Sequence, residues 1–121
     1  MDFENTGLEQ TRADIQVMTE IMNKYGMTSE GAWDYERITY DRKFIIQEGV
    51  YYLRVFGYAV SGDIDANDAM VQLMTPVLGK HYYPHGIEYG ADEIFPEHLV
   101  KKCFDILTSI KADLQEFEIH V

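Results

Sequence analysis

The chain has 121 residues, and its hydrophobic content of 46% is sufficient for the core of one domain. Ten lysines and arginines against 21 aspartates and glutamates give a net charge of −11. Such a surface repels nucleic-acid phosphates and anionic lipids, so we expect neither nucleic acid nor a membrane as a partner. The single cysteine, Cys103, excludes an internal disulfide, and the sequence shows no signal peptide and no apolar run of about 18 residues. We therefore expect a cytoplasmic protein.

The N-terminal part of the chain is predicted to form a helix over residues 7–25, after a loose start over residues 1–6. The apolar stripe of this helix consists of Leu8, Ile15, Met18, Met22 and Tyr25. Thr6, followed by Glu9 three residues later, fits a capping box at the start. Gly26 fits the left-handed position that ends a helix.

Three strands are predicted after this helix. Apolar and charged residues alternate through residues 32–38 and 39–46, which is typical of two short, half-exposed strands. Residues 47–49 form a short hairpin connection. The next segment, residues 50–60, is the longest run of β-forming residues, and neither of its faces is polar. It is therefore predicted to be a central strand that is covered on both sides.

The second half of the chain begins with a polar loop over residues 61–68. Its three aspartates suggest a calcium loop, but the glycine and the distal glutamate of an EF-hand are absent, so a solvated turn is favoured. Residues 69–83 are predicted as one long bent strand, in which Pro76 marks an edge or a bulge. Residues 84–95 are predicted as an irregular connection.

The C-terminal part is predicted to form a second amphipathic helix over residues 96–116, with Pro96 at its first position. Cys103 falls on the apolar stripe, which indicates a small core residue and not a nucleophile. Residues 118–121 are expected to be loose. The order of elements predicts one α+β domain over residues 1–121: an antiparallel four- or five-stranded sheet, flanked by N- and C-terminal helices packed on one face.

This arrangement leaves the second face of the sheet without a helix. Because soluble monomers rarely expose large apolar patches, we expect a homodimer that pairs through this face. Two alternatives are open: the sheet curls on itself, or residues 84–95 fold across the open face.

The candidate ligand-binding residues are aromatic or basic: Trp33, Tyr35, Tyr40, Arg54, His81 and Tyr83. Arg54 lies among aromatic residues, where we expect an ion pair with Asp34 or Asp41; the alternative is an anion bound by Arg54 in an aromatic pocket, with Lys43 nearby. The aromatic residues fit a pocket, although a core or a subunit interface is favoured.

The sequence predicts no metal, cofactor or catalytic residues. His81 and His85 would lie about 13 Å apart on an extended segment, and Pro84 opposes the helix that would bring them together. No nucleophile elbow, phosphate loop or dinucleotide fingerprint is present. A non-catalytic interaction or ligand-binding module is therefore favoured over the alternative, a small enzyme or anion-binding protein that uses Arg54 and His81.

Several short motifs carry a resemblance to a known family. They are Gly31-x-Trp33-Asp34-Tyr35, Tyr40-Asp41-x-Lys43, Leu53-Arg54 and Val71-Gln72-Leu73-x-x-Pro76, with the spacing of His81 and Tyr83. In this order the chain resembles the YugN-like family of small proteins from bacillus-type bacteria, over roughly residues 15–115. The resemblance implies an α+β fold and a cytoplasmic bacterial origin. The family has no established activity, so it implies no catalytic residues.

Overall fold

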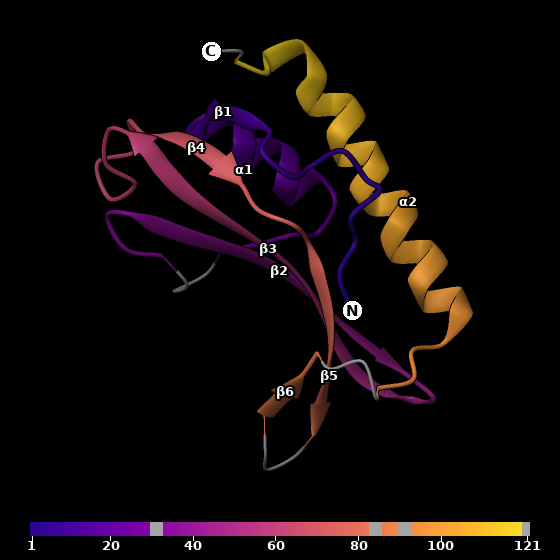
Figure 1. Ribbon diagram of the computed structural model, residues 1–121. Helices are drawn as coiled ribbons and strands as arrows, with labels where there is room; N and C mark the ends of the chain where they lie inside the picture. The colour runs from indigo at the N-terminus through magenta and orange to yellow at the C-terminus, as the bar shows by residue number, and fades with distance from the viewer. Residues whose placement is uncertain (30–32, 83–85, 90–92, 120–121) are drawn as a thin grey trace.

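The computed structural model describes residues 1–29, 33–82, 86–89 and 93–119. Its elements are β1 (Arg12–Asp14), α1 (Ile15–Lys24), β2 (Arg37–Ile46), β3 (Gly49–Ser61), β4 (Met70–Leu73), β5 (Val77–Tyr82), β6 (Gly86–Glu88), α2 (Glu97–Leu114) and the 3-10 turn η1 (Gln115–Phe117). The strands form one antiparallel sheet, and Figure 1 shows both helices on one side of it. The predicted α+β architecture is confirmed, with six strands among the described residues. No helix in the described ranges is long and apolar enough to span a membrane.

Strand β3 is the central strand of the sheet. One edge pairs with β2 over ten residues, from the pair Arg37–Tyr58 to the pair Ile46–Gly49. The other edge pairs first with β5 and then, beyond Phe56, with β4. The central strand, predicted over residues 50–60, is confirmed to within one residue at each end.

The strands on either side of β3 differ from the predictions. Residues 37–46 form one strand and not two, because the sequence offers no turn residue there and β3 supplies a continuous partner edge. Residues 69–83, predicted as one bent strand, are divided into β4 and β5 by residues 74–76. The two strands lie along the same edge of β3, and Pro76, which has no N–H to donate, lies at the break.

The first helix begins eight residues later than predicted, at Ile15. Residues 12–14 pair with β4 as β1, so the chain before the helix is extended. The capping residue is Asp14, whose carboxylate accepts the N–H of Gln16, and the expected Thr6 capping box does not form. Leu8 fits the apolar spacing of the helix and is buried, but it lies at a turn that precedes β1. Its apolar character therefore extended the predicted helix too far toward the N-terminus. Gly26 has the expected positive φ, +76°.

The first residues, which were expected to be loose, lie against β5. The N–H of Phe3 donates to the carbonyl of Pro76, and the N–H of Leu78 donates to the carbonyl of Met1, both at 2.8 Å. Phe3 and Thr6 are buried. At the other end, the N–H of Ile119 donates to the carbonyl of Arg12, whereas residues 120–121 lie outside the described residues. Both ends of the described chain therefore contact the sheet.

The hydrophobic core lies between the helices and one face of the sheet. On β3, Tyr51, Leu53 and Val55 are buried toward the helices, whereas Tyr52 and Arg54 belong to the opposite face and are half-exposed. We call this opposite face the open face. It consists of Arg12 and Asp14 on β1; Arg37, Thr39, Asp41, Lys43 and Ile45 on β2; Val50, Tyr52, Arg54, Phe56 and Tyr58 on β3; Met70 and Gln72 on β4; Val77, Gly79 and His81 on β5; and Ile87 on β6. The central strand is thus covered by helices on one side only.

Truncation of a core side chain should lower the free energy of unfolding more than truncation of an open-face side chain. Leu53→Ala removes a fully buried side chain and should lower the free energy of unfolding by about 2–5 kcal/mol. Ile45→Ala removes a side chain that is 74% exposed and should cost less than about 0.5 kcal/mol. Urea denaturation measures both, and equal losses would contradict the assignment of the faces.

A pH-dependent contact joins the two helices. The carboxylate of Asp113 on α2 accepts hydrogen bonds from Lys24 Nζ at 2.8 Å and from the Tyr25 hydroxyl at 2.7 Å. These bonds lower the pKa of Asp113 below its ordinary value of 3.8. A lowered pKa in the folded state stabilises the protein above the ordinary pKa, and this stabilisation disappears as the pH falls through the folded-state value.

Asp113→Asn should therefore lower the melting temperature at neutral pH, by an amount that shrinks as the pH falls below about 4. Thermal unfolding of both proteins across the acid range measures this difference. A difference that is the same at neutral and at acid pH would show that the charge of Asp113 contributes nothing.

Candidate functional site

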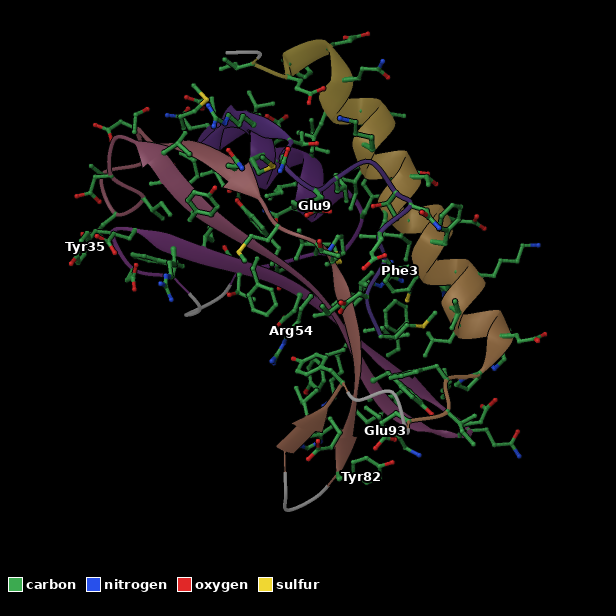
Figure 2. All side chains as sticks on the ribbon, in the orientation of Figure 1. Phe3, Glu9, Tyr35, Arg54, Tyr82 and Glu93 are labelled. Atoms are coloured by element: carbon green, nitrogen blue, oxygen red, sulfur yellow. The ribbon has the colours of Figure 1, made fainter. Side chains whose placement is uncertain are left out.

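Arg54 occupies the middle of the open face and points away from the helices (Figure 2). Three neighbours hold its guanidinium. Nη1 donates to the Tyr89 hydroxyl at 2.9 Å, Nε lies 3.5 Å from Asp41 Oδ2, and the central carbon lies 5.2 Å from the centre of the Tyr52 ring. The side chains of Arg54 and Asp41 are 27% and 30% exposed, although the Nε atom of Arg54 is itself buried.

The predicted ion pair of Arg54 is confirmed, and its partner is Asp41, which lies directly opposite on β2. Asp34 has a different role, since its carboxylate accepts the N–H groups of Glu36 and Arg37 in the turn before β2. The Nε–H of Arg54 has no hydrogen bond within the described part of the chain. The distance of 3.5 Å from Nε to Asp41 Oδ2 is too long for a good hydrogen bond. Among these residues, the guanidinium makes one hydrogen bond and has further N–H groups to offer.

Tyr89 reaches Arg54 because β5 has a glycine at position 79. A Cβ atom at Gly79 would lie 2.6 Å from Tyr89 Cε1 and would also overlap Ile87. The absence of a side chain lets Ile87 and Tyr89 lie across the open face of β5, where the Tyr89 hydroxyl meets Arg54. Ile87 and Tyr89, which follow β5, thus cover part of the open face. This agrees with one of the two alternatives to a dimer, in which residues 84–95 fold across that face. Tyr89 is not among the residues predicted from the sequence, although a glycine inside a strand is a signal for such a close approach.

The structure separates the six predicted ligand-binding residues. Tyr40 is a correction: it is fully buried on the helix side, where its hydroxyl lies 2.6 Å from Thr19 Oγ1 and burial raises its pKa to about 12. Its position opposite Val55, a core residue of β3, places it on that face. Trp33 and Tyr35 are exposed and lie before β2; Figure 2 shows Tyr35 at the far end of the sheet from Arg54.

The other predicted residues are His81 and Tyr83. His81 shares the open face with Arg54, and its ring packs edge-on against Tyr52 with centroids 6.0 Å apart. Tyr52 therefore connects the two residues. Tyr83 lies outside the described residues, as does His85, the second histidine of the disfavoured metal site.

The other candidates for chemistry have structural roles. In the loop before β4, the carboxylates of Asp63 and Asp68 accept backbone N–H groups at 2.8 and 2.7 Å. Within the described ranges, no group of three His, Cys, Asp or Glu residues could hold a metal ion. Cys103 is buried, and desolvation raises the pKa of its thiol to about 12, which favours the unreactive form.

A hollow of about 570 Å³ lies on the open face, beginning one residue pair along β2 and β3 from Arg54, which does not itself line it. Its lining includes Arg37, Thr39, Phe56 and Tyr58 of the open face, together with Met74 and the acidic Glu36. The pair Thr39–Phe56 is the neighbour of the pair Asp41–Arg54 along the two strands. A ligand in this hollow could therefore contact aromatic rings and a guanidinium together.

The contact between Gly79 and Tyr89 can be tested by a single methyl group. Gly79→Ala should displace Tyr89 from β5 and lower the free energy of unfolding by about 1–3 kcal/mol, the usual cost of overpacking. Tyr89→Phe removes only the hydroxyl and should cost about 1 kcal/mol or less. Urea denaturation gives both values, and the nitrogen resonances of the Arg54 side chain report the loss of its partner. A fully stable Gly79→Ala protein with unchanged Arg54 resonances would refute this packing.

The chain and its fold are similar to those of known proteins. The family model described as "YugN-like family" matches residues 4–109. The uncharacterized protein YlbA of Bacillus subtilis (strain 168) is 46% identical over 119 residues, 98% of this chain and 99% of that protein. The uncharacterized protein YugN of the same strain is 26% identical over 78 residues, 64% of this chain and 58% of that protein. A crystal structure of the uncharacterized conserved protein YugN from Geobacillus kaustophilus HTA426 superposes with a TM-score of 0.83 at 47% identity and covers 96% of both chains. This chain belongs to the YugN-like family.

Proposed function

We propose that the protein is a non-catalytic binding module whose open face holds a small anionic ligand at Arg54. The ligand class is a carboxylate or phosphate attached to a flat apolar group. The observation that carries this proposal is the partly satisfied guanidinium of Arg54, which is fixed by Tyr52, Tyr89 and Asp41 beside an aromatic hollow. A non-catalytic role is supported by His81, which has no hydrogen bond to a carboxylate in the described structure, and by the buried thiol of Cys103.

The distribution of charge supports an anionic ligand. The described open face carries four cations, Arg12, Arg37, Lys43 and Arg54, and two acids, Asp14 and Asp41. The whole chain has twice as many acids as cations. The open face is therefore a cationic surface on a strongly acidic protein, and this difference attracts anions to it.

The geometry of Arg54 supports recognition of a carboxylate or a phosphate. A guanidinium binds such groups through two parallel N–H donors, and Nη2 together with the second hydrogen of Nη1 presents such a pair. Contacts with Tyr52 and Tyr89 fix the side chain before a ligand arrives, which reduces the entropy cost of binding. Phe56 and Tyr58 follow Arg54 on the same face of β3 and offer rings for the apolar part.

Titration with benzoate, phenyl phosphate and inorganic phosphate tests the proposal, with amide resonances of β2 and β3 as the readout. Phenyl phosphate and benzoate should bind more tightly than inorganic phosphate, because they carry an aromatic ring. The ratio of the dissociation constants of phenyl phosphate and benzoate shows whether the site prefers a phosphate or a carboxylate. Arg54→Met should weaken binding at least about tenfold, the effect of a lost charge-assisted hydrogen bond. Arg54→Lys, which keeps the charge without the paired donors, should recover only part of it.

Lys101→Met is the matched control, because Lys101 is an exposed cation on α2, away from the open face. It removes the same charge and should leave binding unchanged. Equal weakening by Lys101→Met and Arg54→Met, or resonance changes away from β2 and β3, would refute a site at Arg54.

A homodimer that pairs through the open face is the second candidate, and the exposure of Ile45 and Met74 favours it. Sedimentation at micromolar concentration separates the candidates, since a dimer has twice the 14.0 kDa mass of the chain. Under this candidate, Ile45→Lys should restore the monomer; a 14.0 kDa species in the parent protein would reject the dimer.

As part of the same proposal, the module acts in the cytoplasm. The single cysteine, which is buried and unpaired, supports a reducing compartment. Fractionation of cells that carry the tagged protein tests this placement, and recovery outside the cytoplasmic fraction would reject it.

A further inference from the structure

A groove of about 910 Å³ lies between the N-terminal segment and α2. It shares no lining residue with the open-face hollow, although Tyr89, the hydrogen-bond partner of Arg54, also contributes to it. The N-terminal segment, residues 1–5, forms one side of it, and the first two turns of α2 form the other. Figure 1 shows this segment running between β5 and α2. Hydrogen bonds from Phe3 to Pro76 and from Leu78 to Met1 fix the segment on the sheet, so the groove has a defined wall.

The inside of the groove is apolar. Phe3, Phe95, Val100 and Phe104 contribute to its lining, and Figure 2 shows Phe3 between the sheet and α2. On α2, the residues Glu97, Val100, Lys101 and Phe104 follow the spacing i, i+3, i+4 and i+7, which places them on one side of the helix. Phe104 is 39% exposed although it belongs to this apolar lining. The groove therefore offers unburied aromatic surface to an apolar group.

The rim of the groove is acidic. Four of its lining residues are acidic, Asp2, Glu4, Glu93 and Glu97, and two positive groups, the Lys101 side chain and the N-terminal ammonium of Met1, also belong to the lining. The carboxylate of Glu93 is held in place by the Tyr82 hydroxyl, which donates to it at 2.5 Å. The carboxylates belong to two segments that meet at this groove: the N-terminal residues and the stretch from Glu93 into α2. An occupant that combines apolar surface with positive charge is therefore complementary to this groove.

We infer that this groove docks a short peptide segment of a partner protein, in which apolar side chains alternate with lysine or arginine. The separated carboxylates favour a peptide over a small cation, because a single charge cannot pair with acids on both walls of the groove. The distance along α2 from Glu97 to Phe104 is about 10 Å, enough for three extended residues. The occupant's apolar groups cover Phe104 and Val100, and its cations pair with the rim.

The test uses an acetylated, amidated heptapeptide, Lys-Leu-Lys-Phe-Lys-Leu-Lys, in calorimetry and in amide resonance titrations. It should bind and shift the resonances of residues 2–5 and 97–104. Phe104→Ala should weaken binding about tenfold, as loss of a central aromatic contact does. Glu4→Gln combined with Glu97→Gln should weaken it severalfold and reduce its dependence on salt.

Two controls separate docking from simple attraction to an acidic protein. In one peptide, serine replaces the leucines and the phenylalanine, and it should bind at least about tenfold more weakly because it lacks the apolar contacts. Phe117→Ala is the matched control for Phe104→Ala, since Phe117 is 49% exposed on η1 and does not line the groove. This variant should bind the first peptide as the parent protein does.

Three results would overturn the inference. The first is equal binding of the two peptides, which would mean attraction by charge alone. The second is an equal effect of Phe104→Ala and Phe117→Ala, or resonance changes at the open face instead of the groove. The third is self-association of the free protein that Phe104→Ala abolishes, because the occupant would then be a second copy of this chain.

Discussion

Strand β3 is hydrogen-bonded along both edges over most of its length, and the other elements take their positions from that pairing. One edge of β3 pairs with the long strand β2. The other edge pairs with β5 along its first part and with β4 along its last part. The alternation of side chains along β3 then assigns Leu53 to the core and Arg54 to the opposite face. A one-residue slip in register would exchange these two faces, so the register also fixes the position of the candidate site.

The N-terminal segment completes the outer edge of the sheet. Residues 1–3 and β1 pair along β5 and β4, which would otherwise present unpaired backbone groups to solvent. The same segment forms one wall of the acid-rimmed groove, so protection of the edge and formation of the groove have one cause. The two candidate binding surfaces differ in sign: the open face is cationic around Arg54, whereas the groove is bordered by Asp2, Glu4 and other carboxylates. One small module could thus bind two chemically different partners.

Local patterns were sufficient to predict the central strand, both helices and the pairing of Arg54 with a nearby acid. They did not predict an element boundary or the face of a side chain where pairing with a distant strand determines it. The start of α1 was misplaced because the pairing of residues 12–14 with β4 leaves no local signal. Tyr40 was assigned to a ligand pocket because its face is set by the register between β2 and β3, which the alternation in β2 alone does not determine. Tyr89 was missed because its contact with Arg54 depends on Gly79, in a different strand.

Oxidation of methionine by hydrogen peroxide, followed by peptide mass spectrometry, tests most directly whether the open face is free to bind. Met74 lies beside the open-face hollow and is half-exposed, whereas Met18 and Met22 are fully buried under the covered face. The account predicts that Met74 in dilute protein is oxidised much faster than Met18 and Met22, and that phenyl phosphate slows this reaction. Protection of Met74 equal to that of Met18, without any ligand, would mean that the open face is covered, and would contradict the account.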